Sequence, residues 1–156
     1  MYLWMKLIHI LAVVLFLGNI ITGLFWHRHA ERTRHPRLLA HTMDGIIRSD
    51  RLFTMPGVIV IIATGIFTAV QGGIPLLRTG WIAWSLLLFA ASGLAFMFRV
   101  APLQRELRAL ADAGAASGSF NFDAYHKVAV RWEIWGAVAT VTPLAALWLM
   151  VLKPAF

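Results

Sequence analysis

The chain contains no cysteine and few charged residues. The lack of cysteine excludes disulfides, thiolate metal sites and cysteine nucleophiles. Charged residues make up 13% of the 156 residues and hydrophobic residues 60%, whereas a soluble domain carries about 25% charged residues. So little polar surface remains that most of the surface must face lipid. The length corresponds to a single domain, residues 1–156.

Four apolar stretches account for most of the hydrophobic residues. Each is close to the roughly 20 residues that an α-helix needs to cross a bilayer core, and none carries lysine or arginine in its middle. They do not alternate as the strands of a membrane barrel would. The sequence therefore predicts an all-α integral membrane four-helix bundle with spans at about 7–26, 53–70, 81–98 and 130–152.

Basic residues are distributed unevenly among the connections. Most of the 14 lysines and arginines lie in or beside loops 27–52 and 99–129, whereas only Lys6, Arg78 and Lys153 lie towards the other side. The positive-inside rule predicts that both loops are cytoplasmic and that both termini are outside. We interpret the net charge of +7 as contact with anionic lipid headgroups and expect no nucleic-acid partner.

Both long loops contain helical patterns. Leu38, Leu39, Met43, Ile46 and Ile47 are spaced like one face of a helix, which predicts an amphipathic interfacial helix between the first and second spans.

In the second long loop, Leu103, Leu107 and Leu110 are spaced as a continuation of the third span. The Gly and Ser residues between Gly114 and Ser119 are expected to end that helix.

His9 is the clearest candidate for chemistry because an ionisable group inside a span is costly. Helical spacing places Met5, His9 and His27 on one stripe, with His9 and His27 separated by about five turns. Neutral imidazole is a common axial ligand of haem iron, and an apolar four-helix bundle is a suitable place for a porphyrin. The alternative is a structural hydrogen bond from His9 to a neighbouring helix.

More histidines gather at the cytoplasmic end. Acidic residues accompany them, and the set comprises His27, His29, His35, His41, His126, Glu31, Asp44, Asp50 and Glu133. Such a set could bind a metal or the edge of a second haem. No pair has the spacing of a zinc-binding helix motif, and His27 and His29 point in different directions on a helix. His27, His29 and His126 remain candidate ligands, and the alternative is a set of basic residues at a headgroup surface.

Further polar residues lie within or beside the spans. Asn19 is expected to hydrogen-bond across the bundle, and Arg131 to extend towards the headgroups. Glu133 is expected to turn inwards, either as a proton-handling carboxylate or in an ion pair. In that ion pair the expected partner of Glu133 is Arg48, Arg51 or Arg99.

Pro143 predicts a local kink in the fourth span. We expect the hydroxyl of Thr140 or Thr142 to satisfy the carbonyl that the proline frees.

Several short segments resemble the bacterial HemJ-type protoporphyrinogen oxidases. They are residues 2–10 (Tyr-Leu-Trp-Met-Lys-Leu-Ile-His-Ile), 29–31 (His-Ala-Glu), 51–57 (Arg-Leu-Phe-Thr-Met-Pro-Gly), 80–81 (Gly-Trp) and 153–156 (Lys-Pro-Ala-Phe). The resemblance implies a haem b protein of the inner membrane that oxidises protoporphyrinogen IX to protoporphyrin IX and passes electrons towards quinone. It also implies that His9 takes part in haem binding.

The sequence departs from that family at two positions. Where the family has a lysine shortly after Gly-Trp, this chain has Ser85, and of the family's Asn-Glu-Pro only Glu133 is present. The whole chain is more similar to small predicted integral membrane proteins of bacteria, a domain-of-unknown-function family numbered 2269. The run Asp-x-Leu-Phe-Thr-x-Pro-Gly at residues 50–57 is typical of it.

Two functions follow as hypotheses. The first is a haem-b-binding inner-membrane redox protein related to HemJ-type oxidases, with porphyrin or quinone as partner. The second is a non-enzymatic accessory or scaffold subunit, as a homo-oligomer or with another membrane protein. No nucleophile–base constellation, phosphate loop or dinucleotide fingerprint is present. His9 is the one histidine on the outer side, so a second axial ligand would be Met5, Met150, another subunit or none.

Overall fold

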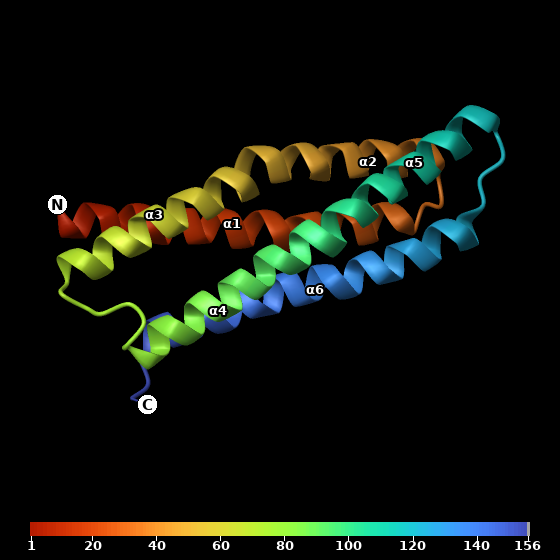
Figure 1. Ribbon diagram of the computed structural model, residues 1–156. Coiled ribbons are helices and arrows are strands. Elements are labelled where there is room, and N and C mark those ends of the chain that lie inside the picture. The colour runs from red at the N-terminus through yellow and green to blue at the C-terminus, as the bar shows by residue number, and fades with distance from the viewer. Residues whose placement is uncertain (156) are drawn as a thin grey trace.

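The computed structural model describes residues 1–155, and within them every regular element is helical (Figure 1). The elements are α1 (Tyr2–Glu31), α2 (Pro36–Ser49), the π-helical turn η1 (Asp50–Thr54), α3 (Met55–Gln71), α4 (Gly80–Ala95), the π-helical turn η2 (Phe96–Val100), α5 (Ala101–Ser117) and α6 (Phe122–Leu152). Because η1 and η2 join their neighbours without a break, the chain forms four long rods. Each rod contains one predicted span, which confirms the all-α four-helix prediction.

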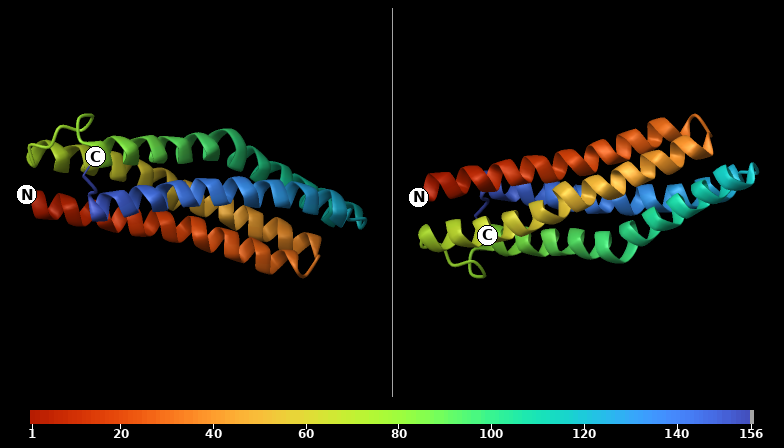
Figure 2. Two further views of the ribbon diagram at one scale, coloured as in Figure 1. Left: turned by 90° about the horizontal axis from the view of Figure 1, so that it is seen from below. Right: turned by 90° about the horizontal axis from the view of Figure 1, so that it is seen from above.

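The connections alternate between the two ends of the bundle. Both termini and the connection between α3 and α4 lie at one end, whereas the α1–α2 and α5–α6 connections lie at the other (Figures 1 and 2). The principal neighbours are α1 with α3, α4 with α6, and α2 with α5. This arrangement places the two basic loops at the same end of the bundle.

Large apolar side chains cover the outside of the rods. Leu3, Val14, Ile59, Leu87 and Val151 are all exposed, and each lies on a different part of the four rods. A soluble protein does not present apolar surface around its whole girth. The described rods are therefore suited to contact with lipid tails.

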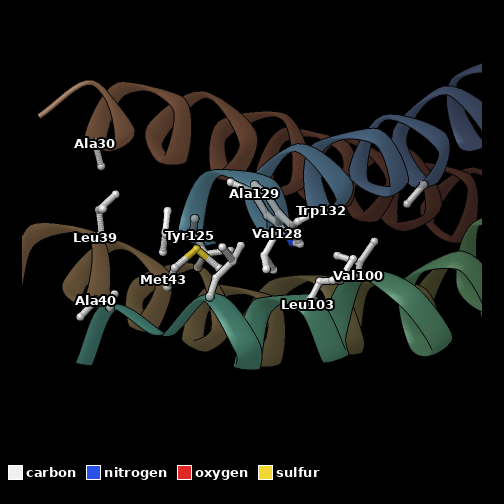
Figure 3. Close-up of a cluster of buried hydrophobic side chains, with 14 of the residues drawn as sticks. Ala30, Leu39, Ala40, Met43, Val100, Leu103, Tyr125, Val128, Ala129 and Trp132 are labelled. Carbon is white, nitrogen blue, oxygen red and sulfur yellow. The ribbon is translucent and has the colours of Figure 1, made fainter. Parts of the chain in front are cut away.

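The largest buried apolar cluster lies at the end opposite the termini (Figure 3). Leu39 and Met43 of α2, Leu107 of α5 and Tyr125 of α6 are completely buried there. The cluster holds α2, α5 and α6 together beyond the predicted spans. Leu107 also shows that the third span continues as a helix, and α5 ends at Ser117 with Gly118 in the left-handed conformation that favours glycine.

A helix occupies residues 36–49, where the sequence predicts an amphipathic segment. Leu39, Met43 and Ile46 on its apolar face pack into the buried cluster, whereas Leu38 is exposed. The apolar face therefore contacts protein over much of its length. The expected position of this helix on the membrane surface stays a prediction.

Each π-helical turn ends two residues before a proline. In η1 the Met55 N–H reaches back to the Asp50 carbonyl, and in η2 the Ala101 N–H reaches back to Phe96. Proline has no N–H and crowds the carbonyl four residues earlier, and a π turn widens the helix locally. Pro56 and Pro102 follow these turns, so both rods absorb a proline at the level where the bundle carries its buried polar groups.

The proline in α6 is accommodated by a neighbouring helix. Pro143 cannot donate to the Ala139 carbonyl, and the Ser92 hydroxyl of α4 donates to that carbonyl at 2.7 Å. Thr140 and Thr142 instead donate to carbonyls four residues before themselves. The expectation that a threonine satisfies the freed carbonyl is therefore wrong, because Ser92 lies across the tight α4–α6 contact and does so.

Candidate functional site

Two groups of polar side chains are buried between the rods. The first surrounds Asp50, the first residue of η1. Its Oδ1 accepts hydrogen bonds from Asn19 Nδ2 at 3.0 Å and Thr54 Oγ1 at 2.8 Å. Its Oδ2 accepts one from Gln104 Nε2 at 2.8 Å. The donors come from α1, η1 and α5, so this carboxylate ties three rods together.

A small cavity lies beside Asp50. It has a volume of about 20 Å³, and its lining includes Asp50, Gln104, Trp132 and Gly136. This is room for about one water molecule. The indole Nε1 of Trp132 is buried and has no hydrogen-bond partner within the described chain. The cavity is lined mainly by apolar groups, with Asn19, Asp50 and Gln104 as its polar side chains, and its lining residue Trp132 carries an unsatisfied donor.

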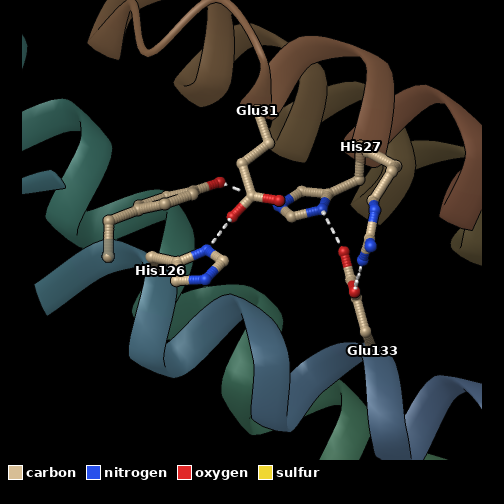
Figure 4. A network of polar contacts seen from close by, with 6 residues as sticks. His27, Glu31, His126 and Glu133 are labelled. Carbon is tan, nitrogen blue, oxygen red and sulfur yellow. Dashed lines mark hydrogen bonds and ion pairs between the residues drawn. The ribbon is translucent and has the colours of Figure 1, made fainter. Parts of the chain in front are cut away.

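The second group is centred on His27 of α1, which is completely buried (Figure 4). Its Nε2 lies 3.0 Å from the hydroxyl oxygen of Tyr125, and its ring lies 4.7 Å from the Trp132 ring. Tyr125 and Trp132 are seven residues apart on α6 and so share a face. They enclose the imidazole from the side of α6.

Two carboxylates converge on the same histidine. Glu31 lies one turn after His27 on α1, and its Oε1 accepts a hydrogen bond from His126 Nδ1 at 2.8 Å. Glu133 of α6 pairs through Oε2 with Arg28. Its other oxygen, Oε1, lies 3.8 Å from His27 Nδ1, which is too long for a hydrogen bond. Both atoms are buried and lack a partner within the described residues.

The structure places the predicted site residues at different ends of the bundle. His27, His126 and Glu133 come together around Glu31, whereas His29 stays exposed and stacks near Phe25. Arg131 is exposed and lies 4.0 Å from Glu106. His9 is separated from this group along α1.

The expected partners of Glu133 were wrong. Glu133 reaches Arg28 of α1 instead of Arg48, Arg51 or Arg99, because α6 packs against the end of α1 at this level. Sequence reasoning also missed Tyr125 and Gln104 as members of the polar groups. The seven-residue spacing of Tyr125 with Trp132 and of His126 with Glu133 was the available signal.

His9 lies between α1 and α3. Its Nδ1 is 3.1 Å from the Ile61 carbonyl and 3.0 Å from Thr64 Oγ1. A carbonyl only accepts, so Nδ1 carries the hydrogen and Nε2 keeps a free lone pair. A Cβ at Gly65 would lie 3.2 Å from His9 Cε1, which shows how closely the imidazole approaches α3.

Four apolar helical rods with outward-facing hydrophobic side chains and polar groups enclosed between them define a helical integral membrane protein. The chain belongs to the family of predicted integral membrane proteins DUF2269, whose family model matches residues 3–154. No curated protein matches the chain, and neither does any solved structure. The family carries no assigned activity, so the function has to be argued from the two ends of the bundle.

Proposed function

We propose that this protein is a haem-b-binding redox protein of the bacterial inner membrane, as its resemblance to HemJ-type oxidases implies. The observation that supports this proposal is the hydrogen bonding of the His9 ring. Its Nδ1–H is held by the Ile61 carbonyl, and its Nε2 is left with a lone pair. Histidines that bind metal through one ring nitrogen usually donate the other N–H to a carbonyl or carboxylate in this way. His9 therefore has the tautomer that an axial ligand of haem iron requires.

The other candidate histidines fit a haem less well. His27 is enclosed by Tyr125 and Trp132, so a porphyrin has no access to its ring. His29 and His126 lie at the far end of the bundle from His9. Met5 lies one turn before His9 on the same face of α1, so it flanks the ligand and cannot bind the opposite side of the iron. We therefore expect a five-coordinate haem, or a second ligand from Met150 or another subunit.

The bound haem would supply one-electron chemistry in the lipid phase. Within this proposal the electron partner is a quinone and the substrate a porphyrin, since both are apolar enough to reach a site between α1 and α3 from the bilayer. The role of this chain's own residues is to hold the imidazole. Ile61 and Thr64 fix its orientation, and Gly65 leaves room for the ring.

The test is a reduced-minus-oxidised visible spectrum of the protein purified in mild detergent. We expect a b-type signal in the parent and its loss in His9→Ala, because no other described histidine lies at that end of the bundle. His29→Ala is the matched control, since His29 is exposed and at the other end, and it should keep the signal. A folded parent that stays colourless when haem is supplied, or a full signal in His9→Ala, would contradict the proposal.

The second candidate is an accessory or scaffold subunit without a redox role. Ser85 favours it, because this position is a lysine in HemJ-type oxidases. Here the Ser85 hydroxyl is buried and lies within hydrogen-bonding distance of two backbone carbonyls, Trp81 at 2.7 Å and Ala146 at 3.2 Å. It serves packing between α4 and α6. A folded, colourless parent in the spectral experiment would make this the better candidate.

We also propose the orientation that the basic residues indicate. The end that carries the α1–α2 and α5–α6 connections would face the cytoplasm, and both termini would lie outside. The exposed Leu38 on α2 would then rest on the headgroup region of the inner leaflet.

A further inference from the structure

The group around His27 has the geometry of a metal site. His27, Glu31 and Glu133 each offer one ligand atom, and these atoms all lie within 4.8 Å of one another. His27 is completely buried and Glu31 nearly so. The three side chains come from only two helices, α1 and α6, and they point towards a common centre (Figure 4).

The two unpartnered atoms face each other at the centre of this group. His27 Nδ1 and Glu133 Oε1 are both buried without a hydrogen-bond partner in the described chain, and 3.8 Å separates them. Two tetrahedral ligands that each bind Zn²⁺ at about 2.1 Å lie about 3.4 Å apart. The observed separation is thus too long for a direct hydrogen bond and close to that of two ligands on one ion.

Outer partners already orient each ligand. The Tyr125 hydroxyl lies 3.0 Å from His27 Nε2. In the tautomer that carries its hydrogen on Nε2, the imidazole donates to the phenol oxygen and presents a lone pair on Nδ1. Arg28 holds the far oxygen of Glu133, and His126 holds one oxygen of Glu31. Ligands in metal sites are typically fixed by such partners. An ion pair between His27 Nδ1 and Glu133 Oε1 forms only with a protonated imidazole, and with a neutral imidazole both central atoms are left without a partner in the described chain.

We propose that His27, Glu31 and Glu133 bind a divalent transition-metal ion at the end of the bundle opposite the termini. One imidazole and two carboxylates are ligands that Zn²⁺ accepts. Mg²⁺ fits worse because it requires near-octahedral oxygen coordination. Three protein ligands would leave a fourth position for water. This site is separate from the haem proposed at His9.

The proposal can be tested with ZnCl₂ alone on the full chain. The purified protein is stripped with a chelator, exchanged into mild detergent and titrated calorimetrically. We expect one tight Zn²⁺ per chain. Glu133→Gln keeps the side-chain volume and removes the anionic ligand, so the affinity should fall by at least tenfold. Glu106→Gln is the matched control, because Glu106 is an exposed carboxylate outside the site, and it should bind as the parent does.

Further variants keep the result decisive. Tyr125→Phe retains the ring and removes the acceptor for His27 Nε2–H, so we expect a loss of about tenfold even if Glu133→Gln fails to fold. His9→Ala should bind Zn²⁺ normally, which separates this result from the haem proposal. The proposal is overturned if the stripped parent binds no Zn²⁺. That result would indicate that water, instead of a metal ion, bridges His27, Glu31 and Glu133. The proposal is also overturned if folded Glu133→Gln binds Zn²⁺ as tightly as the parent does. If Glu133→Gln does not fold, the same outcome for folded Tyr125→Phe overturns it. Unchanged binding would mean that Zn²⁺ binds weakly to exposed histidines, which both variants keep.

Discussion

Asp50 accepts three side-chain hydrogen bonds. Three donors on three rods reach its two oxygens. A buried carboxylate is retained only where such donors compensate for its desolvation. The Gln104 amide depends on this carboxylate as its acceptor, whereas the Asn19 amide also donates to Thr54 Oγ1 at 2.9 Å.

We predict that Asp50→Ala lowers the free energy of unfolding by about 3 kcal/mol. The substitution leaves the buried Gln104 amide without its acceptor and leaves Asn19 with Thr54 Oγ1 as its remaining acceptor, and a buried group without a partner costs about 1–3 kcal/mol. Asp50→Asn should cost less, since the Gln104 amide can turn and present its oxygen. Unfolding by denaturing detergent, monitored by circular dichroism, measures both.

Asp44→Ala is the control for that comparison. Asp44 pairs with Arg48 and Arg108 on the surface, where ion pairs contribute up to about 1 kcal/mol. An Asp50→Ala variant no less stable than Asp44→Ala would show that the network around Asp50 does not hold the rods together.

At the scale of elements, α4 and α6 are joined by serine hydroxyls as well as by close packing. Ser92 donates to the Ala139 carbonyl of α6 at 2.7 Å. Ser85, seven residues earlier on α4, shares its one hydroxyl hydrogen between the Trp81 carbonyl at 2.7 Å and the Ala146 carbonyl of α6 at 3.2 Å. The two bonds differ in one respect. The Ala139 carbonyl has lost its helical donor to Pro143, whereas the Ala146 carbonyl has the Met150 N–H four residues on.

We therefore expect Ser92 and Pro143 to be energetically coupled. Ser92→Ala alone should destabilise the protein by about 1 kcal/mol, the size of a hydrogen bond between membrane helices. With Pro143→Ala present, residue 143 supplies the helical N–H and the effect of Ser92→Ala should shrink towards zero. A double-mutant cycle on the unfolding free energy measures this coupling.

Ser85→Ala provides the matched comparison in the same experiment. Its effect should be the same with and without Pro143→Ala, since its acceptor does not depend on the proline. Equal coupling of both serines to Pro143 would contradict the role of Ser92 as the donor that replaces the N–H missing at Pro143.

At the scale of the whole molecule, charge and polar chemistry are concentrated at one end. Both basic loops lie at the end opposite the termini, and the proposed metal site lies there as well. The other end carries His9 alone among the histidines. The two proposed sites would therefore lie near opposite ends of the bundle.

We predict the orientation of the bundle from this distribution. The chain has no cysteine, so single-cysteine variants label without background. Gln71→Cys at the end of α3 should react with a membrane-impermeant maleimide in intact spheroplasts. Ser119→Cys, between α5 and α6, should react only after permeabilisation, because the basic loops are retained in the cytoplasm. The reverse pattern would place both termini inside.

The sequence by itself determined the all-helical class, the four long apolar helices and the placement of both basic loops at one end. These properties follow from composition and from the length needed to cross a bilayer, and both are local along the chain. The same holds for the continuation of the third span through Leu107 and for the end of that helix near Gly118.

Only the tertiary structure decided which polar groups meet. His27 and Glu133 are far apart in the chain, and no spacing rule joins residues on α1 to residues on α6. Pro143 shows the same limit. The Ala139 carbonyl that it leaves without a helical donor was expected to accept a hydrogen bond within α6, and it accepts one from Ser92 of α4 instead. Contacts between helices depend on their rotation and offset, which side-chain packing sets and which a single apolar pattern leaves open.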